Sequence, residues 1–367
     1  MIKEAITNLV KGKDIPEKDM ESAMDEIFSG RCTPAQTGAF MTALRIKGET
    51  VDEITAAARI LRSRAKKIRV GNTLVNLDRD EVNLEDETIL DTCGTGGDGT
   101  NTFNISTATA LVAAAGGVKV AKHGNRAVSS RCGSADVLSN LGVRLDINQA
   151  SLERCIEEIG IGFIYTPMFH GVMRHVAGPR QEVGIRTIFN LLGPLTNPAG
   201  ATVQLLGVYK HDLTEIMARV LRRLGVHEAF VVCGDETLDE ISICGPTLLT
   251  HLKCGEIKTK RVEPEDFGFE RAEPESIRGG DARENARIIR DVLDGKNGAQ
   301  RDVVLLNAAA AFVVAGLDSD FQAGAERAGE AVDSGRAREK LDRLISFTQN
   351  CRPFVRGEIA GIRAAGE

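Results

Sequence analysis

The sequence predicts an α/β fold class: a small all-helical domain plus a large α/β domain with a mostly parallel central sheet. Residues 1–66 carry helix signals only. From residue 88 onward, short apolar runs alternate with helical segments, which is the spacing of βαβ units. Two Gly-rich polar segments follow the first two apolar runs, and right-handed crossovers place both at the carboxyl edge of one sheet. A chain of 367 residues is long enough for two such domains.

The helical prediction for residues 1–66 rests on two capping boxes. Thr33 precedes a proline and is followed three residues later by Gln36, and Thr50 is followed three residues later by Glu53. Each pair begins a stretch whose apolar residues recur at helical spacing. The loops between these stretches are short, so we predict one compact helical module.

The α/β prediction rests on the order of the apolar runs. Residues 67–87 are polar and acidic and are predicted to form a connector or a hairpin. Residues 170–192 look helical and interrupt the alternation, and a rigid Gly193-Pro194 turn follows them. We predict strands at 88–92, 118–121, 163–165, 203–209 and 229–233, and helices at 108–115, 135–141, 212–224 and 282–294.

Composition excludes several classes of function. The formal net charge of −6 argues against broad electrostatic attachment to nucleic acid or to an anionic membrane, and the absence of Trp argues against aromatic stacking on bases. The apolar run at 303–316 is short for a membrane span and contains Asn307, so we expect a buried helix. No secretory signal is evident, and the 8 cysteines show no C-x-x-C pair, so free thiols in a cytoplasmic protein are expected.

The first Gly-rich segment (residues 94–107) combines a glycine turn with Asn and hydroxyl residues before a helix. Gly94, Gly96 and Gly99 match the dinucleotide fingerprint, but the expected helix begins too late and the residues near Lys119 are cationic where an acid is needed. No Gly-Lys-Ser/Thr is present, which excludes a P-loop. The segment suits a phosphate or diphosphate, and an ordinary turn is the alternative.

The second Gly-rich segment (residues 122–134) supplies two cations, Lys122 and Arg126, and several hydroxyls directly after a strand. This composition predicts a second anion site beside the first. A solvated basic turn is the alternative, and the occurrence of both segments on nearby strands makes it less favoured.

Two further features are ambiguous from the residues alone. Asp239 and Glu240, here called the acid pair, follow a predicted strand and would suit Mg²⁺ beside a polyphosphate, but Asp235 and Glu236 compete and spacing does not choose. Arg180 could form a fork for a carboxylate, although the residues alone favour a surface cation.

At these residues the chain resembles the anthranilate phosphoribosyltransferase family over nearly its whole length. Five motifs occur in family order: Gly94-Thr95-Gly96-Gly97-Asp98, Asn104-Ile105-Ser106-Thr107, Lys122-His123-Gly124-Asn125-Arg126, Gly193-Pro194-Leu195-Thr196-Asn197-Pro198 and Leu238-Asp239-Glu240. The resemblance implies the fold of the nucleoside phosphorylases and related phosphoribosyltransferases. It implies a helical domain of 1–66 plus about 170–192, for dimerisation and anthranilate, and an α/β domain of 67–169 plus 193–367, for phosphoribosyl diphosphate and metal.

The resemblance also implies the activity: transfer of the phosphoribosyl group of 5-phosphoribosyl 1-diphosphate to the amine of anthranilate, in tryptophan biosynthesis. It implies a homodimer with two Mg²⁺ per subunit, small-molecule substrates, and no nucleic-acid or membrane partner. No residue is implied as a covalent nucleophile. The implied phosphoribosyl diphosphate residues are Gly94, Gly97, Asp98, Thr102, Asn104, Ile105, Ser106, Thr107, Lys122, His123, Gly124, Asn125, Arg126, Ala127, Val128, Ser129, Ser130 and Ser134. The implied anthranilate residues are Gly94, Asn125 and Arg180, and the implied metal ligands are Ser106, Asp239 and Glu240.

Two departures and two rival functions accompany this resemblance. Arg131-Cys132 stands where the family pattern has Lys-Ser, and the connector 67–87 is longer than the pattern. A pyrimidine nucleoside phosphorylase would need only a phosphate site. A non-catalytic nucleic-acid-binding relative would show a basic face and damaged acids. The intact acid pair and the negative net charge favour the transferase.

Overall fold

The computed structural model describes residues 1–71, 87–127, 131–235 and 237–354. The chain begins with a bundle of four helices, and both predicted capping boxes are formed there. The amides of Gln36 and Glu53 donate to the hydroxyls of Thr33 and Thr50, each at 3.2 Å. The predicted helical domain is therefore confirmed. Its helices are α1 (Ile2–Val10), α2 (Glu17–Phe28), α3 (Pro34–Lys47) and α4 (Val51–Arg64).

A seven-stranded sheet in the order β3-β2-β1-β4-β5-β6-β7 forms the centre of the α/β domain. β3, β2, β1, β4 and β5 are parallel, which confirms the predicted sheet and gathers their carboxyl ends at one edge. β6 and β7 add an antiparallel hairpin that the sequence did not predict. The strands are β1 (Ile89–Gly94), β2 (Lys119–Gly124), β3 (Ile161–Tyr165), β4 (Val203–Gly207), β5 (Glu228–Gly234), β6 (Thr247–Lys253) and β7 (Glu256–Val262).

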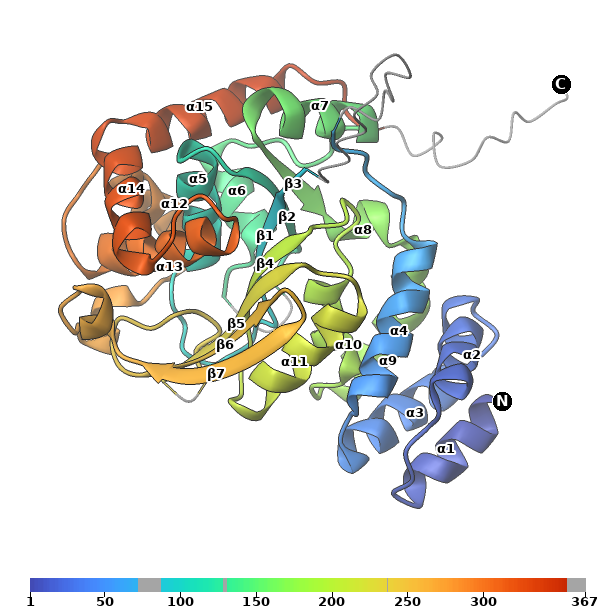
Figure 1. Cartoon of the computed structure of the whole chain (residues 1–367). Helices are drawn as coiled ribbons and strands as arrows, with labels where there is room; N and C mark the ends of the chain where they lie inside the picture. Colours follow the sequence, from blue (N-terminus) through green and yellow to red (C-terminus); the bar gives the residue numbers. More distant parts are fainter. Residues whose placement is uncertain (72–86, 128–130, 236, 355–367) are drawn as a thin grey trace, which may run out of the picture.

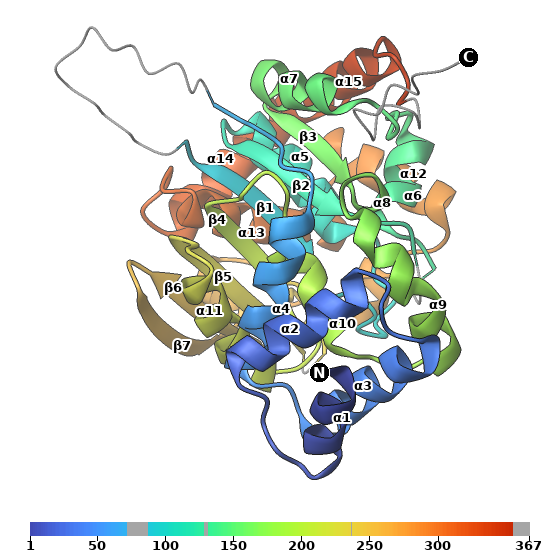
Figure 2. The ribbon, with the colours of Figure 1, turned by 90° about the vertical axis from the view of Figure 1, so that its right-hand side faces the viewer.

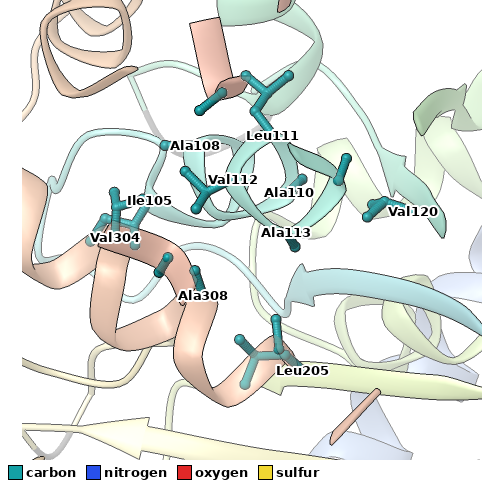
Figure 3. Packing of buried hydrophobic residues seen from close by; sticks show 14 of the residues in the cluster. Ile105, Ala108, Ala110, Leu111, Val112, Ala113, Val120, Leu205, Val304 and Ala308 are labelled. Atoms are coloured by element: carbon teal, nitrogen blue, oxygen red, sulfur yellow. The ribbon is translucent and has the colours of Figure 1, made fainter. Parts of the chain in front are cut away.

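The two larger of the three hydrophobic clusters in the described residues lie on opposite faces of the sheet, because neighbouring strand residues point to opposite sides. Leu205 of β4 belongs to the core under α5 and α13, and Leu206 belongs to the core shared with α11 and the helical bundle. Figure 3 shows Ile105 of α5 packed near Val304 and Ala308 of α13. The helices of this domain are α5 (Ile105–Ala115), α6 (Ser134–Leu141), α7 (Gln149–Ile159), α11 (Asp212–Arg223), α12 (Ala282–Leu293), α13 (Ala299–Val314), α14 (Phe321–Asp333) and α15 (Arg336–Gln349).

After β3 the chain returns to the helical bundle before it forms β4. The returning helices are α8 (Thr166–Phe169), α9 (Arg174–Val183) and α10 (Ile188–Leu192). α9 contacts α2 and α3, and α10 contacts α3 and α4. Figures 1 and 2 show α9 and α10 on the side of the α/β domain that faces the bundle. Arg62 of α4 joins the two domains by donating to the carbonyls of Leu195 at 2.6 Å and Leu224 at 3.0 Å.

The element boundaries differ from prediction at the two Gly-rich segments. Lys122, His123 and Gly124, expected in a loop, are the last residues of β2, because β3 pairs with them to the end of the strand. α5 begins at Ile105, three residues before the predicted start. Most of the predicted connector, residues 72–86, lies outside the described residues. In the described part of the chain no helix is long and apolar enough to cross a membrane, and no two cysteines there form a disulfide.

Candidate active site at the carboxyl edge of the sheet

The site opens where β1 and β2 separate. Their ladder includes Ile89 with Lys119 and Leu90 with Val120, whereas β1 continues to pair with β4 as far as Gly94. Beyond Leu90 the buried carboxylate of Asp91 fills the gap between the strands. It accepts from the amide of His123 at 3.1 Å and from Nδ2 of Asn197 at 2.8 Å. Burial raises the pKa of Asp91 to about 6, although Lys122 opposes this shift.

Lys122 lies in the same gap and is 3% exposed. Its ammonium donates to the carbonyl of Thr92 and, at 3.2 Å, to the hydroxyl of Ser106 at the start of α5. Burial lowers the pKa of Lys122, and the carboxylates of Asp91 and Glu240 oppose that effect. The end of β2 thus brings a cation to the first Gly-rich segment, which is where the sequence predicts an anion.

The first Gly-rich segment turns sharply after β1. Gly96, Gly97 and Gly99 have φ of +70°, +64° and +83°, a left-handed region that favours glycine. The segment ends at α5, whose N-terminal amides favour an anion. Ile105 and Thr107 were predicted to contact phosphoribosyl diphosphate. Both side chains are buried, so any contact from an exposed atom would have to come from their backbone. Thr107 lines a cavity of about 10 Å³ beside Lys122.

The acid pair is bonded directly to the first Gly-rich segment. Oδ2 of Asp239 accepts from the amide of Gly96 at 2.7 Å, and Oε1 of Glu240 accepts from the amide of Ser106 at 2.9 Å. Two glycines permit this approach. A Cβ on Gly94 would lie 2.3 Å from Oδ2 of Asp239, and a Cβ on Gly207 would lie 1.6 Å from the Asp239 carbonyl oxygen.

The competing acid Asp235 has a different environment. The hydroxyl of Ser242 donates to its carboxylate, and its own amide donates to the carbonyl of Pro246 at 2.9 Å. Glu236 lies outside the described residues. The structure therefore brings the acid pair, but not Asp235, into contact with the first Gly-rich segment.

The acid pair has the chemistry of a Mg²⁺ site. Burial and the neighbouring Asp98 carboxylate raise the pKa of Asp239 to about 7, and burial with the Asp239 charge raises the pKa of Glu240 well above its usual value. A divalent cation would compensate this accumulated negative charge. Within the described ranges no group of three or more His, Cys, Asp or Glu side chains is placed to hold a metal. Two carboxylates and the Ser106 hydroxyl fit Mg²⁺, which completes its shell with water and substrate phosphates.

The second Gly-rich segment folds onto α6 through Asp136. This carboxylate accepts from the amides of Ala127 at 2.9 Å and Gly133 at 3.0 Å, and from Arg126 at 2.8 Å. These bonds lower the pKa of Asp136 despite its partial burial. The hydroxyl of Ser134 donates to the Asn125 carbonyl at 3.4 Å. Residues 128–130, predicted to bind phosphoribosyl diphosphate, lie outside the described residues.

The predicted acceptor side contains Arg180, which is half-buried on α9. Its guanidinium lies 5.7 Å from the centroid of the Phe189 ring, and burial lowers its pKa. No hydrogen bond or ion pair within the described part of the chain engages this guanidinium. A half-buried cation without an anionic partner is suited to bind a carboxylate. The structure does not join it by a hydrogen bond to Asn125, whose side chain is exposed.

Two buried histidines, His123 and His170, lie side by side near the end of β2. The rings of His123 and His170 are 5.1 Å apart. Burial lowers the pKa of His123 to about 3 and that of His170 to about 4. Nδ1 of His123 lies 3.2 Å from the carbonyl of Gly193, and Nε2 lies 3.1 Å from the hydroxyl of Thr166. His123 therefore anchors the end of β2 to the turn after α10.

Asn285 of α12 supports the site and was not predicted. It is 2% exposed and donates from Nδ2 to Oδ1 of Asn104 at 3.0 Å. Asn104 in turn donates to the carbonyl of Cys132 at 3.2 Å. This hydrogen bond connects the two Gly-rich segments, and it uses the backbone of Cys132, one of the two residues that differ from the family pattern. The available signal was a polar residue on the buried side of a predicted helix. Its partner, 181 residues away, could not be read from the sequence.

Comparison with known proteins identifies the class of this fold and site. Residues 3–65 match the helical bundle domain of a glycosyl transferase family, and residues 86–338 match the a/b domain of a glycosyl transferase family. The chain, a helical bundle joined to an α/β domain, therefore belongs to this class of glycosyl transferases.

Individual relatives narrow the class. The anthranilate phosphoribosyltransferase of Geobacter sp. (strain M21) is 55% identical over 348 residues, covering 95% of this chain and 99% of that protein, and the one of Geobacter sulfurreducens is also 55% identical over 95% and 99%. The chain belongs to the anthranilate phosphoribosyltransferase family.

Solved structures agree with this membership. The anthranilate phosphoribosyltransferase from Thermus thermophilus is 40% identical with a TM-score of 0.85, over 94% of this chain and 99% of that one. The enzyme from Saccharomyces cerevisiae in complex with phosphoribosyl diphosphate (PRPP) and Mg is 29% identical with a TM-score of 0.84, and the match covers 95% of this chain and 98% of that chain. The same yeast enzyme has been solved in complex with 4-fluoroanthranilate, at 28% identity and a TM-score of 0.82, over 95% and 98%.

Proposed function

We propose that this protein transfers the phosphoribosyl group of 5-phosphoribosyl 1-diphosphate to the amine of anthranilate, giving N-(5-phosphoribosyl)anthranilate and diphosphate. The observation that carries the proposal is that the acid pair accepts hydrogen bonds from the first Gly-rich segment, where Lys122 also donates to Ser106. The chain is a member of the anthranilate phosphoribosyltransferase family. The reaction belongs to tryptophan biosynthesis. The two rival functions are not favoured, because the full-length relatives are anthranilate phosphoribosyltransferases.

The chemistry requires charge stabilisation and orientation. The amine nitrogen forms a bond to C1 of the ribose, the bond from C1 to the diphosphate oxygen breaks, and diphosphate leaves with the electron pair. An aryl amine is neutral near pH 7, so no covalent nucleophile is needed and the amine proton is lost as the bond forms. Mg²⁺ held by Ser106 and the acid pair would offset charge on the diphosphate.

The chain supplies the remaining groups. Lys122 offers a buried ammonium beside Ser106, where negative charge develops on the leaving group. The glycine turn offers backbone amides to the phosphates, and α5, whose Ser106 amide already donates to Glu240, contributes the positive end of its dipole. Arg180 and Asn125 hold the acceptor, with the guanidinium on its carboxylate. Orienting the two substrates relative to each other then lowers the barrier.

The wider assignments belong to the same proposal. The phosphoribosyl diphosphate residues are those implied by the resemblance in the two Gly-rich segments, and two Mg²⁺ bind per subunit. The protein is a cytoplasmic homodimer that associates through its helical domain, where Val10 and Ile46 are 73% and 80% exposed. Sedimentation of the wild-type protein at the mass of a monomer would contradict the dimer.

The activity is tested by anthranilate fluorescence in the presence of phosphoribosyl diphosphate and Mg²⁺. We expect the signal to fall as the product forms and a chelator to stop the fall. Fluorescence that stays constant would overturn the transferase. Phosphorolysis of uridine or thymidine that resists a chelator would support the phosphorylase, and salt-sensitive DNA binding without turnover would support the nucleic-acid-binding relative.

A further inference from the structure

A fully buried asparagine lies in the apolar part of helix α13, beyond its polar first turn. Asn307 is 0% exposed, and its carboxamide is hydrogen-bonded on both sides. Nδ2 donates to the carbonyl of Ile241 at 2.9 Å and to the carbonyl of Val303 at 2.8 Å, while Oδ1 accepts from the amide of Ile241 at 3.0 Å. One side chain therefore pairs with both polar groups of a single distant residue.

Ile241 needs these partners because of where it lies. It is 1% exposed, and it belongs to no strand or helix that could pair its backbone. Buried backbone amides and carbonyls must be hydrogen-bonded, since an unpaired one costs stability. The carboxamide of Asn307 has one donor side and one acceptor side, like a peptide group. It therefore makes the two hydrogen bonds that a neighbouring strand would otherwise make with the backbone of Ile241.

Ile241 directly follows Glu240, so this pairing fixes one end of the acid pair. The other end is fixed by two hydrogen bonds between the backbones of Gly234 and Leu238, each at 2.8 Å. Only Asp239 and Glu240 lie between these two anchors. We propose that Asn307 is a positioning residue for the acid pair and sets the affinity of the site for Mg²⁺, an inference that rests on the proposed function.

The alternative is that Asn307 only stabilises the fold. Both roles predict that Asn307→Ala lowers the free energy of unfolding, but only a positioning role predicts a changed metal dependence. The matched control is Thr348→Ala in α15. Thr348 is 2% exposed, accepts from the amide of Arg144 at 3.1 Å and donates to the carbonyl four residues earlier at 2.9 Å, so its loss removes similar bonds, none of which involves the acid pair or Ile241.

The first measurement is the rise in melting temperature of the full chain at fixed phosphoribosyl diphosphate as Mg²⁺ is titrated. We expect Asn307→Ala to raise the Mg²⁺ concentration at half effect by about 10–100-fold, the scale of losing an outer partner of a metal ligand. The KM for anthranilate at saturating Mg²⁺ should stay unchanged. The isosteric Asn307→Asp, which loses both donors from Nδ2, should shift the curve in the same direction.

The second measurement is amide hydrogen exchange, first on the wild-type protein and then on the Asn307 variants. We expect the Ile241 amide to exchange as slowly as the amides of α13, and residues 239–242 to exchange faster in the Asn307 variants. Equal Mg²⁺ curves for Asn307→Ala and Thr348→Ala, or a wild-type Ile241 amide that exchanges like a surface amide, would overturn the inference. Absence of anthranilate turnover by the wild type would instead overturn the proposed function.

Discussion

The backbone amide of Ser106 donates to Oε1 of Glu240 at 2.9 Å. This bond places a carboxylate on the N-terminus of α5, at the end of the first Gly-rich segment, although the two residues are 134 positions apart. Asp239 makes the equivalent bond to Gly96. In the proposed function the same carboxylates would hold Mg²⁺, which would place the metal beside the segment proposed to bind the phosphates.

The first prediction concerns the acid pair. Asp239→Asn combined with Glu240→Gln keeps the shape of both side chains and removes both charges. We expect kcat/KM to fall about 100-fold or more, the scale of losing a preorganised electrostatic group, and the dependence on Mg²⁺ to weaken. The melting temperature without Mg²⁺ should not fall, because burial raises both pKa values and disfavours the charges. Asp235→Asn is the control, and an equal loss there would contradict the choice of acids.

The second prediction concerns the glycines that admit Asp239. Gly94→Ala places a Cβ 2.3 Å from the Asp239 carboxylate, which can move aside, so we expect a loss mainly in activity. Gly207→Ala places a Cβ 1.6 Å from the backbone oxygen of Asp239, so we expect unfolding to become easier by about 1–3 kcal/mol or more. Gly329→Ala in α14 meets nothing within 4 Å and should stabilise by about 0.5–1 kcal/mol. Urea titrations compare the three.

The sequence predicted most of the fold because its signals are local. Capping residues such as Thr33 and Thr50 and the apolar runs of β1 to β5 need no distant information. The hairpin of β6 and β7 was missed because β7 is largely exposed and charged, so it lacks an apolar face. The start of α5 was predicted at residue 108, three residues too late, because Asn104 and Ser106 are typical of loops. In the structure they form the helix start.

The site was predictable only in part, because its decisive contacts are between distant residues. Asp235 and Asp239 look alike in sequence. The glycine at 207 allows the backbone of Asp239 to approach β4, and Ser242 engages Asp235. Arg180 could not be separated from a surface cation without knowing its burial and its lack of an anionic partner. Its role and those of the other site residues remain predictions.

The third prediction tests Arg180. We expect Arg180→Ala to raise the KM for anthranilate by about 10–150-fold, which corresponds to about 1.5–3 kcal/mol for a hydrogen bond to a charged group. The KM for phosphoribosyl diphosphate should change little. Arg180→Lys should recover only part of the loss, since an ammonium cannot form the planar fork. Arg174→Ala, exposed on the same helix, is the control, and an equal effect there would remove the assigned role.

The fourth prediction tests Asn285. Asn285→Ala leaves Oδ1 of Asn104 and the amide of Gly280 without this partner, at a cost of about 1–3 kcal/mol for each group. We expect the KM for phosphoribosyl diphosphate to rise while the KM for anthranilate stays constant. Asp281→Ala removes the N-cap of the same helix, costs about 1 kcal/mol, and should leave both KM values unchanged. If Asp281→Ala raises the same KM, the effect belongs to helix stability.

The fifth prediction concerns pH and the buried histidines. The pKa of His123 is lowered to about 3 and that of His170 to about 4, so between those values and an unfolded pKa near 6.5 the unfolded chain binds more protons. The free energy of unfolding must then fall as pH falls through this window, by about 2 kcal/mol per histidine between pH 7 and pH 5. Asp91, whose pKa is raised to about 6, acts in the opposite direction, so the contribution of one histidine has to be measured as the difference between the wild type and a variant that lacks it.

His170→Asn should flatten the pH dependence of the free energy of unfolding by about 2 kcal/mol between pH 7 and pH 5. The exposed His227→Asn controls for the loss of a histidine as such. Parallel pH curves for the wild type and His170→Asn would show that His170 binds its proton equally well in the folded and the unfolded protein, and would contradict this prediction.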